Sequence, residues 1–134
     1  MIEWDIVAKI KADTTMDTLL SSTGTDPKLY PLQAPPGAVT PYILYACAGM
    51  GPEDEVLDEE RLQFTVVDSS YKNAGDIRDR LKAIFDLQDR VSITSDTYYI
   101  YWGKLTGNQD LVDTELSLYN RVVFFNFKFR KKTE

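Results

Sequence analysis

The stretch from residue 64 to residue 86, FTVVDSSYKNAGDIRDRLKAIFD, joins the end of a strand to the start of a helix. Apolar residues at 62, 64 and 66 alternate with Gln63 and Thr65, the pattern of a half-buried strand. Ser70 is a typical helix N-cap. After it, apolar side chains recur at helical spacing, at Ala74, Ile77, Leu81, Ile84 and Phe85. The stretch predicts a strand over about 61–70 and an amphipathic helix whose apolar stripe packs on the sheet.

Two helices and a proline-rich segment are predicted before this stretch. Ile2, Ile6, Val7 and Ile10 define one side of a helix over 2–12, and Thr15 is the expected cap of a short second helix. Residues 30–48 read YPLQAPPGAVTPYILYACA. Because proline fixes φ and lacks an N–H donor, we expect a rigid extended lead-in and a strand that starts at or just after Pro41.

The remaining pattern predicts an α+β fold. The strand over 42–48 is apolar on both faces, as expected if both faces are covered or if it contacts another subunit, and it pairs antiparallel with the next strand. Two more strands are expected at 97–105 and 121–130, separated by a polar loop or hairpin tip over 106–119. We therefore predict one domain over 1–134, a four-stranded mainly antiparallel sheet with helices packed on one face.

Composition argues against several functions. The net charge of −6 disfavours a nucleic-acid-binding module, and the basic run KFRKK at 128–132 is interpreted as a solvated strand end. The sequence has no histidine, the commonest general base and metal ligand, so we predict no enzyme activity, no cofactor and no metal site. Cys47, the single cysteine, is expected to be a small buried hydrophobe.

We interpret neither the acidic cluster nor the aromatic cluster as a ligand-binding site. Six carboxylates occupy residues 53–60, but without the spacing of an EF-hand calcium loop, so a solvated acidic loop is expected. The aromatic residues at 98–102 could stack nucleic-acid bases only beside a positive groove, so core or subunit contacts are favoured. Glu3 and Asp5 do not fit a secretory signal, and no apolar run could span a membrane. We therefore expect a soluble protein made in a cytoplasm.

Three segments resemble the tail terminator, or tail completion, proteins of long-tailed bacteriophages. They are KLYPLQAPPGAVTPYILY at 28–45, the strand-to-helix junction at 64–86, and the aromatic strand RVVFFNFKF at 121–129. The most specific is the proline segment, in which a Tyr-Pro pair, further prolines and a glycine precede the first long strand. The resemblance extends over nearly the whole chain.

The resemblance implies a hexameric ring at the head-proximal end of a virion tail. Such a ring caps the tail tube, stops its polymerisation and presents a surface to the head connector or neck protein, while DNA passes through the lumen without specific binding. The expected partners are copies of the chain itself, the tail tube protein and the neck protein, with no membrane. A rigid proline lead-in suits either a contact with a neighbouring copy or an intramolecular brace for the first strand.

Two sets of residues are candidates for these contacts. The expected inter-subunit contacts are Pro35, Pro36, Tyr42, Leu44 and Tyr45. The expected lumen-facing or tube-facing acids are Glu53, Asp54, Glu55, Asp58, Glu59, Glu60, Asp110, Asp113 and Glu115. The alternatives are another neck, head-tail adaptor or minor tail protein and, from a different class, a monomeric cytoplasmic module that binds a peptide at a sheet edge.

Overall fold

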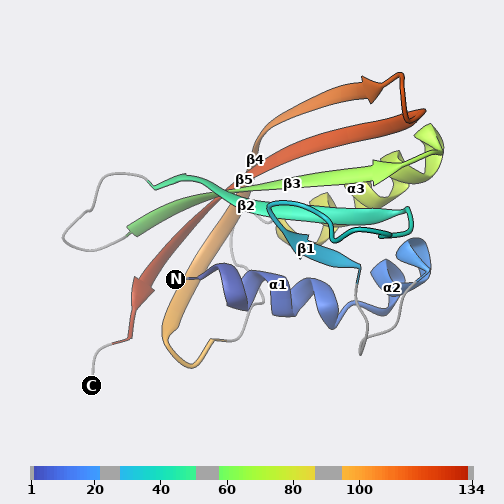
Figure 1. The fold of residues 1–134 in the computed structure, drawn as a ribbon. Helices are drawn as coiled ribbons and strands as arrows, with labels where there is room; N and C mark the ends of the chain where they lie inside the picture. Colours follow the sequence, from blue (N-terminus) through green and yellow to red (C-terminus); the bar gives the residue numbers. More distant parts are fainter. Residues whose placement is uncertain (1, 22–27, 51–57, 87–94, 133–134) are drawn as a thin grey trace.

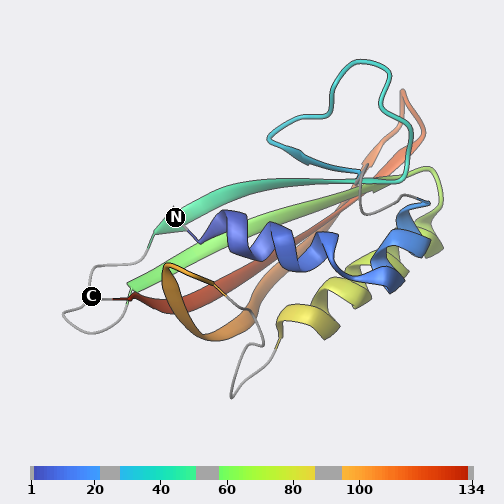
Figure 2. The same cartoon turned by 90° about the horizontal axis from the view of Figure 1, so that it is seen from below.

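The computed structural model describes residues 2–21, 28–50, 58–86 and 95–132. The elements follow in the order α1 (Glu3–Lys11), α2 (Thr14–Leu20), β1 (Leu29–Pro31), β2 (Tyr42–Met50), β3 (Asp58–Asp68), α3 (Tyr71–Phe85), β4 (Tyr98–Asp113) and β5 (Leu118–Lys131). The described strands form one sheet in the order β1-β2-β3-β5-β4. The helices cover one face of this sheet (Figures 1 and 2). The predicted α+β class and one-sided helix layer are therefore confirmed.

The sheet differs from the prediction in its number of strands. It has five strands in the described part of the chain, because the short strand β1 pairs parallel with β2 at one edge. The other pairs are antiparallel, including the predicted pair of β2 and β3. β2 begins at Tyr42, directly after Pro41, as predicted. Pro31 ends the edge strand β1, a position where a missing N–H donor is tolerated.

The two strands of the closing hairpin are longer than predicted. β4 extends to Asp113 and β5 begins at Leu118, so most of the expected loop over 106–119 is strand. This part of β4 is exposed on both faces and lacks the alternation that indicates a strand, but it pairs with β5 residue by residue up to Asp113. The prediction of a hairpin tip holds only for the turn over 114–117.

The helix starts follow capping chemistry. Ser70 caps α3 as predicted, accepting a hydrogen bond from the Asn73 N–H at 3.2 Å. The cap of α2 is Asp13, not Thr15, and it accepts from the Met16 N–H at 3.0 Å. The same carboxylate accepts two hydrogen bonds from Arg80 on α3, at 3.0 and 2.7 Å. This charge-assisted pair holds α2 to α3.

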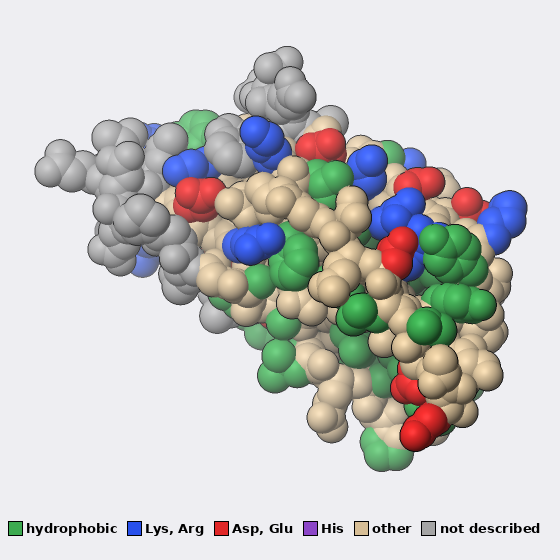
Figure 3. Space-filling view, turned by 90° about the horizontal axis from the view of Figure 1, so that it is seen from above, with side chains coloured by type: hydrophobic (Ala, Val, Ile, Leu, Met, Phe, Trp, Pro, Cys, Tyr) green, Lys and Arg blue, Asp and Glu red, His purple; other side chains and the backbone are tan. Residues whose placement is uncertain are grey.

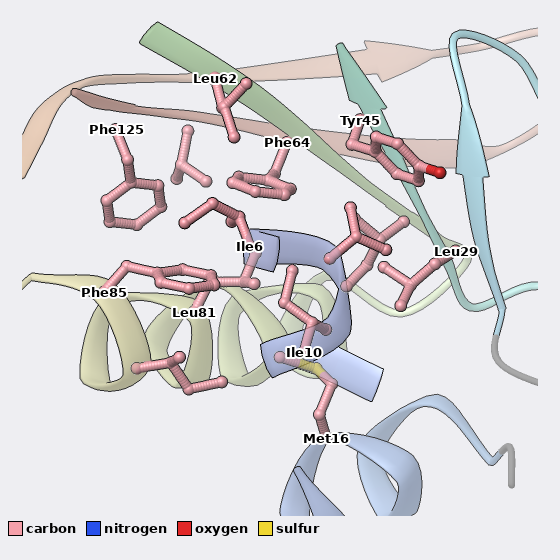
Figure 4. Close-up of a cluster of buried hydrophobic side chains, with 14 of the residues drawn as sticks. Ile6, Ile10, Met16, Leu29, Tyr45, Leu62, Phe64, Leu81, Phe85 and Phe125 are labelled. Atoms are coloured by element: carbon pink, nitrogen blue, oxygen red, sulfur yellow. The ribbon is translucent and has the colours of Figure 1, made fainter. Parts of the chain in front are cut away.

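The core lies between the sheet and the helices (Figure 4). The inward residues of β3 and β5 meet the apolar stripes of α1 and α3, and Phe64, Phe85, Phe125 and Phe127 are its largest fully buried side chains. The Phe85 ring stacks on Phe64 at 5.9 Å and meets Phe127 edge-on at 5.5 Å. The prediction for Cys47 is wrong, because this residue is exposed near the end of β2, where the register with β3 shifts.

Candidate assembly surfaces

The proline segment between β1 and β2 stands away from the sheet (Figure 2). The Leu32 N–H binds the Tyr45 carbonyl at 2.9 Å, and the Ala38 N–H closes a turn on the Pro35 carbonyl at 3.1 Å. Gly37 has a φ of +79°, a conformation that favours glycine. Leu32 is 76% exposed and Val39 69% exposed. The segment is thus internally fixed, yet it presents apolar side chains to solvent.

The residues predicted to contact a neighbouring copy do not share one surface. Pro35 and Pro36 are exposed, and Tyr42 and Leu44 are partly exposed on the face of β2 that points away from the helices. Tyr45 points to the opposite face and is only 6% exposed within the core. Its role is therefore packing inside the subunit, while the other four residues stay available for contact.

The acidic stretch at 53–60 is not a single loop. Glu53, Asp54 and Glu55 lie outside the described residues, whereas Asp58, Glu59 and Glu60 belong to β3. Glu59 accepts a hydrogen bond from Asn126 at 2.7 Å and lies 3.2 Å from the Lys128 ammonium. Glu60 is 2% exposed. The expectation of a solvated loop is therefore wrong for these last two carboxylates.

Burial and the charge of Glu60 raise the pKa of two groups, the Glu3 carboxyl at the start of α1 and the Cys47 thiol. Burial, and then the charge of Glu60, raise the pKa of the Glu3 carboxyl above its usual value. Partial burial also raises the pKa of the Cys47 thiol, and both carboxylates add to this rise because a thiolate beside them would be repelled. The Tyr45 pKa is raised by burial and then by Glu3. Among the described residues, no group of His, Cys, Asp or Glu side chains is arranged to hold a metal ion.

The other acidic stretch lies on the β4–β5 hairpin. Asp110 stands between two guanidinium groups, 3.7 Å from Arg78 and 3.6 Å from Arg121. Arg121 is buried and lies over the Tyr71 ring at 3.8 Å, so this cluster fixes the hairpin against the start of α3. Asp113 accepts from two backbone N–H groups of the turn, those of residues 115 and 116, both at 3.1 Å. Glu115 is exposed.

Exposed apolar side chains accompany these acids. Leu111, Val112 and Leu116 are 47%, 58% and 67% exposed. Sequence reasoning missed this group because it treated 106–119 as a polar loop, although the adjacent pair at 111–112 was a visible signal. The register places the hairpin and the proline segment at the same end of the sheet, since residues 42, 67, 120 and 111 lie in one row across four strands.

The opposite end of the β4–β5 ribbon is basic and aromatic. Arg130 and Lys132 lie over the Tyr99 ring, at 5.4 and 5.1 Å from its centroid. The Lys132 ammonium also donates to the Ser95 carbonyl at 2.6 Å. Tyr99 and Tyr101 are 47% and 37% exposed. The run at 128–132 is thus a strand end as predicted, but two of its cations, Arg130 and Lys132, lie over an aromatic ring.

Comparison with known proteins gives a fold match and no sequence match. No protein-family model matches the chain, and a comparison with curated proteins finds no significant match. The fold resembles a chain in a solved structure described as the virion of a native gene transfer agent particle, with a TM-score of 0.70. The match covers 95% of this chain and 92% of that chain at 9% identity. At this identity, the similarity establishes a shared fold.

No helix in the described part of the chain combines the length and apolar character needed to cross a membrane.

Proposed function

We propose that this chain is a structural protein of a phage-like virion, and that it acts as a tail terminator. The observation that carries the proposal is the match, over nearly the full length of both chains, to a chain of a gene transfer agent virion. The resemblance of the proline segment, the strand-to-helix junction and the closing strand to tail terminator proteins supports the finer assignment. The role is non-enzymatic and depends on shape and surface chemistry.

In this proposal, six copies of the chain form a closed ring on the last ring of the tail tube. Tube rings stack through a heterologous contact, and such stacking has no end of its own. A protein that binds the last tube ring with one face, and offers no site for another tube ring on its other face, is therefore needed to stop tube growth. The partly exposed side of β2 and the exposed prolines at 35 and 36 are suited to contacts with a neighbouring copy or the tube. The other face engages the neck protein.

The charge of the chain suits a ring through which DNA passes. Six copies would carry a formal charge of −36. Ring carboxylates that lie within about 8 Å of the DNA phosphates, one Debye length at physiological salt, repel the DNA backbone and prevent it from binding to the ring. Tight binding of double-stranded DNA by the purified protein at physiological salt would contradict this part of the proposal.

The decisive experiment deletes the gene from the genome that encodes the particle. A terminator predicts over-long tubes without heads, together with filled heads without tails, in negative-stain images of the lysate. A plasmid copy of the gene should restore joined particles with tails of normal length. Headless tails of normal length would instead indicate a head-side adaptor, and unchanged particles would indicate a function outside the virion.

A further inference from the structure

The two ends of the β4–β5 ribbon have complementary surfaces. We define the hairpin end as Leu111, Val112, Asp113, Glu115 and Leu116, and the basic end as Tyr99, Tyr101, Arg130, Lys131 and Lys132. The first combines exposed apolar side chains with two carboxylates. The second combines exposed aromatic rings with three cations. Figure 3 shows acidic side chains beside apolar ones at the lower right corner of the molecule, while basic and acidic side chains are mixed over the rest of this face.

Neither surface is neutralised within its own copy. The Glu115 carboxylate makes no hydrogen bond or ion pair with any described residue, whereas Asp110 nearby already faces two arginines. At the other end, Arg130 lies over the Tyr99 ring and makes no ion pair with a described residue. The two ends therefore have formal charges of opposite sign, −2 from Asp113 and Glu115 and +3 from Arg130, Lys131 and Lys132.

The two ends cannot meet in one copy. Residues 99 and 111 lie on the same strand, and at roughly 3.3 Å per residue they are about 40 Å apart. This distance is several times the screening length of about 8 Å, so the charges of the two ends do not interact within one copy. Each end can pair its charges only with a second molecule. A contact between unlike surfaces of identical copies is heterologous, and it closes into a ring if the rotation between copies divides a full turn.

We propose that the hairpin end of one copy docks on the basic end of the next copy. In this contact, the Glu115 carboxylate accepts hydrogen bonds from the Arg130 guanidinium, a pairing that can be bidentate. The apolar side chains at 111, 112 and 116 pack on the tyrosine rings, which removes apolar surface from water on both sides. The inference rests on the proposed ring, because it names the surfaces by which copies of the chain join.

The first test reverses charge on each side of the contact in the strain that lacks the gene. Glu115→Arg and Arg130→Glu, each alone, place like charges opposite one another and should lower the yield of joined particles by about tenfold or more. The double variant Glu115→Arg/Arg130→Glu restores the pairing and should recover most of the yield. Glu115→Arg/Lys11→Glu is the matched control, because it has the same net charge but changes an exposed lysine on α1.

The second test traps the contact covalently. In a Cys47→Ser background, Leu116→Cys and Tyr101→Cys in the same chain should give a ladder of disulfide-linked oligomers from purified particles, ending at the ring number. Either cysteine alone should give no ladder, since hairpin ends do not meet one another. Particles that assemble with the double-cysteine variant but show no cross-linked species after mild oxidation would overturn the inference.

The outcomes separate this inference from the proposed function. If the gene deletion gives over-long tubes but both single reversals join heads and tails normally, copies meet through other surfaces and the terminator role stands. If the reversed variants join normally and their particles retain DNA more tightly, the hairpin carboxylates face DNA in the lumen. If the deletion leaves normal tails, the proposed function fails regardless of the charge reversals.

Discussion

Replacing Gly103 by alanine should destabilise the protein at the junction of β4 and α3. A Cβ atom at this position would lie 2.6 Å from the Phe85 carbonyl oxygen and 2.7 Å from Cε1 of the Phe127 ring. One neighbour is helix backbone and the other is a fully buried ring, so neither can move aside freely. Both distances must grow by almost 1 Å to reach ordinary contact, which requires a shift of β4 or of the end of α3.

Overpacking of this kind destabilises folded proteins by about 1–3 kcal/mol. For a chain of 134 residues, this corresponds to a fall in Tm of about 4–10 °C. Gly107→Ala is the matched control in the same strand, because its Cβ would lie 3.5 Å from Arg61 and from Phe124, at ordinary contact distance. Alanine is also favoured over glycine within a strand by roughly 0.5–1 kcal/mol, so this control should be neutral or slightly stabilising.

The assay is thermal unfolding followed by far-UV circular dichroism, with urea unfolding as a second measure of the free energy. A Tm of the Gly103→Ala variant within about 1 °C of the wild-type value would refute the reasoning, since overpacking predicts a larger loss. An equal fall in Tm for the Gly107→Ala variant would show that the loss at Gly103 does not come from overpacking against Phe85 and Phe127.

Two further predictions concern titratable groups. Burial by itself would raise the pKa of Asp13, but the hydrogen bonds from Arg80 and Met16 and the Arg80 charge together lower it. Arg80→Ala should therefore reduce the free energy of unfolding by about 1 kcal/mol at pH 7, and urea unfolding should show this difference shrinking as the pH falls below about 4. Cys47 should react completely with a thiol reagent in the folded state, and more slowly than in urea at the same pH, because its thiol pKa is raised. No reaction before unfolding would contradict its exposure.

The sequence predicted the parts of the fold in which burial imposes a period. The helix stripes and the alternation of β3 and β5 predicted the one-sided helix layer and the core, because most inward positions are apolar. Glu60 was missed because it lies in a charged run, although continuing the alternation of Leu62 and Phe64 backward by one step places it inward. β1 was missed because three residues ending in Pro31 carry no period, and only pairing with β2 makes them a strand.

The candidate surfaces were less predictable, since they depend on residues distant in sequence. The composition of KFRKK indicates a basic strand end, but only pairing with β4 brings Tyr99 beside its cations. In the same way, Asp110 looked like one of several loop acids. Its contacts with Arg78 and Arg121 come from an unpredicted extension of β4 over the start of α3.

The contacts along β4 also explain why its ends, and not its middle, are suited to meeting another copy. An exposed edge strand of this length is a template for indiscriminate pairing with other chains. Here the Leu105 N–H donates to the Asp86 carboxylate at 3.0 Å, and the Phe85 carbonyl crowds the backbone at Gly103. The register shifts beside 101 and 106 further interrupt the edge. The end of α3 therefore blocks strand addition along the middle of β4, and contact is left to the side chains at the two ends of the ribbon, where charge can decide which surface meets which.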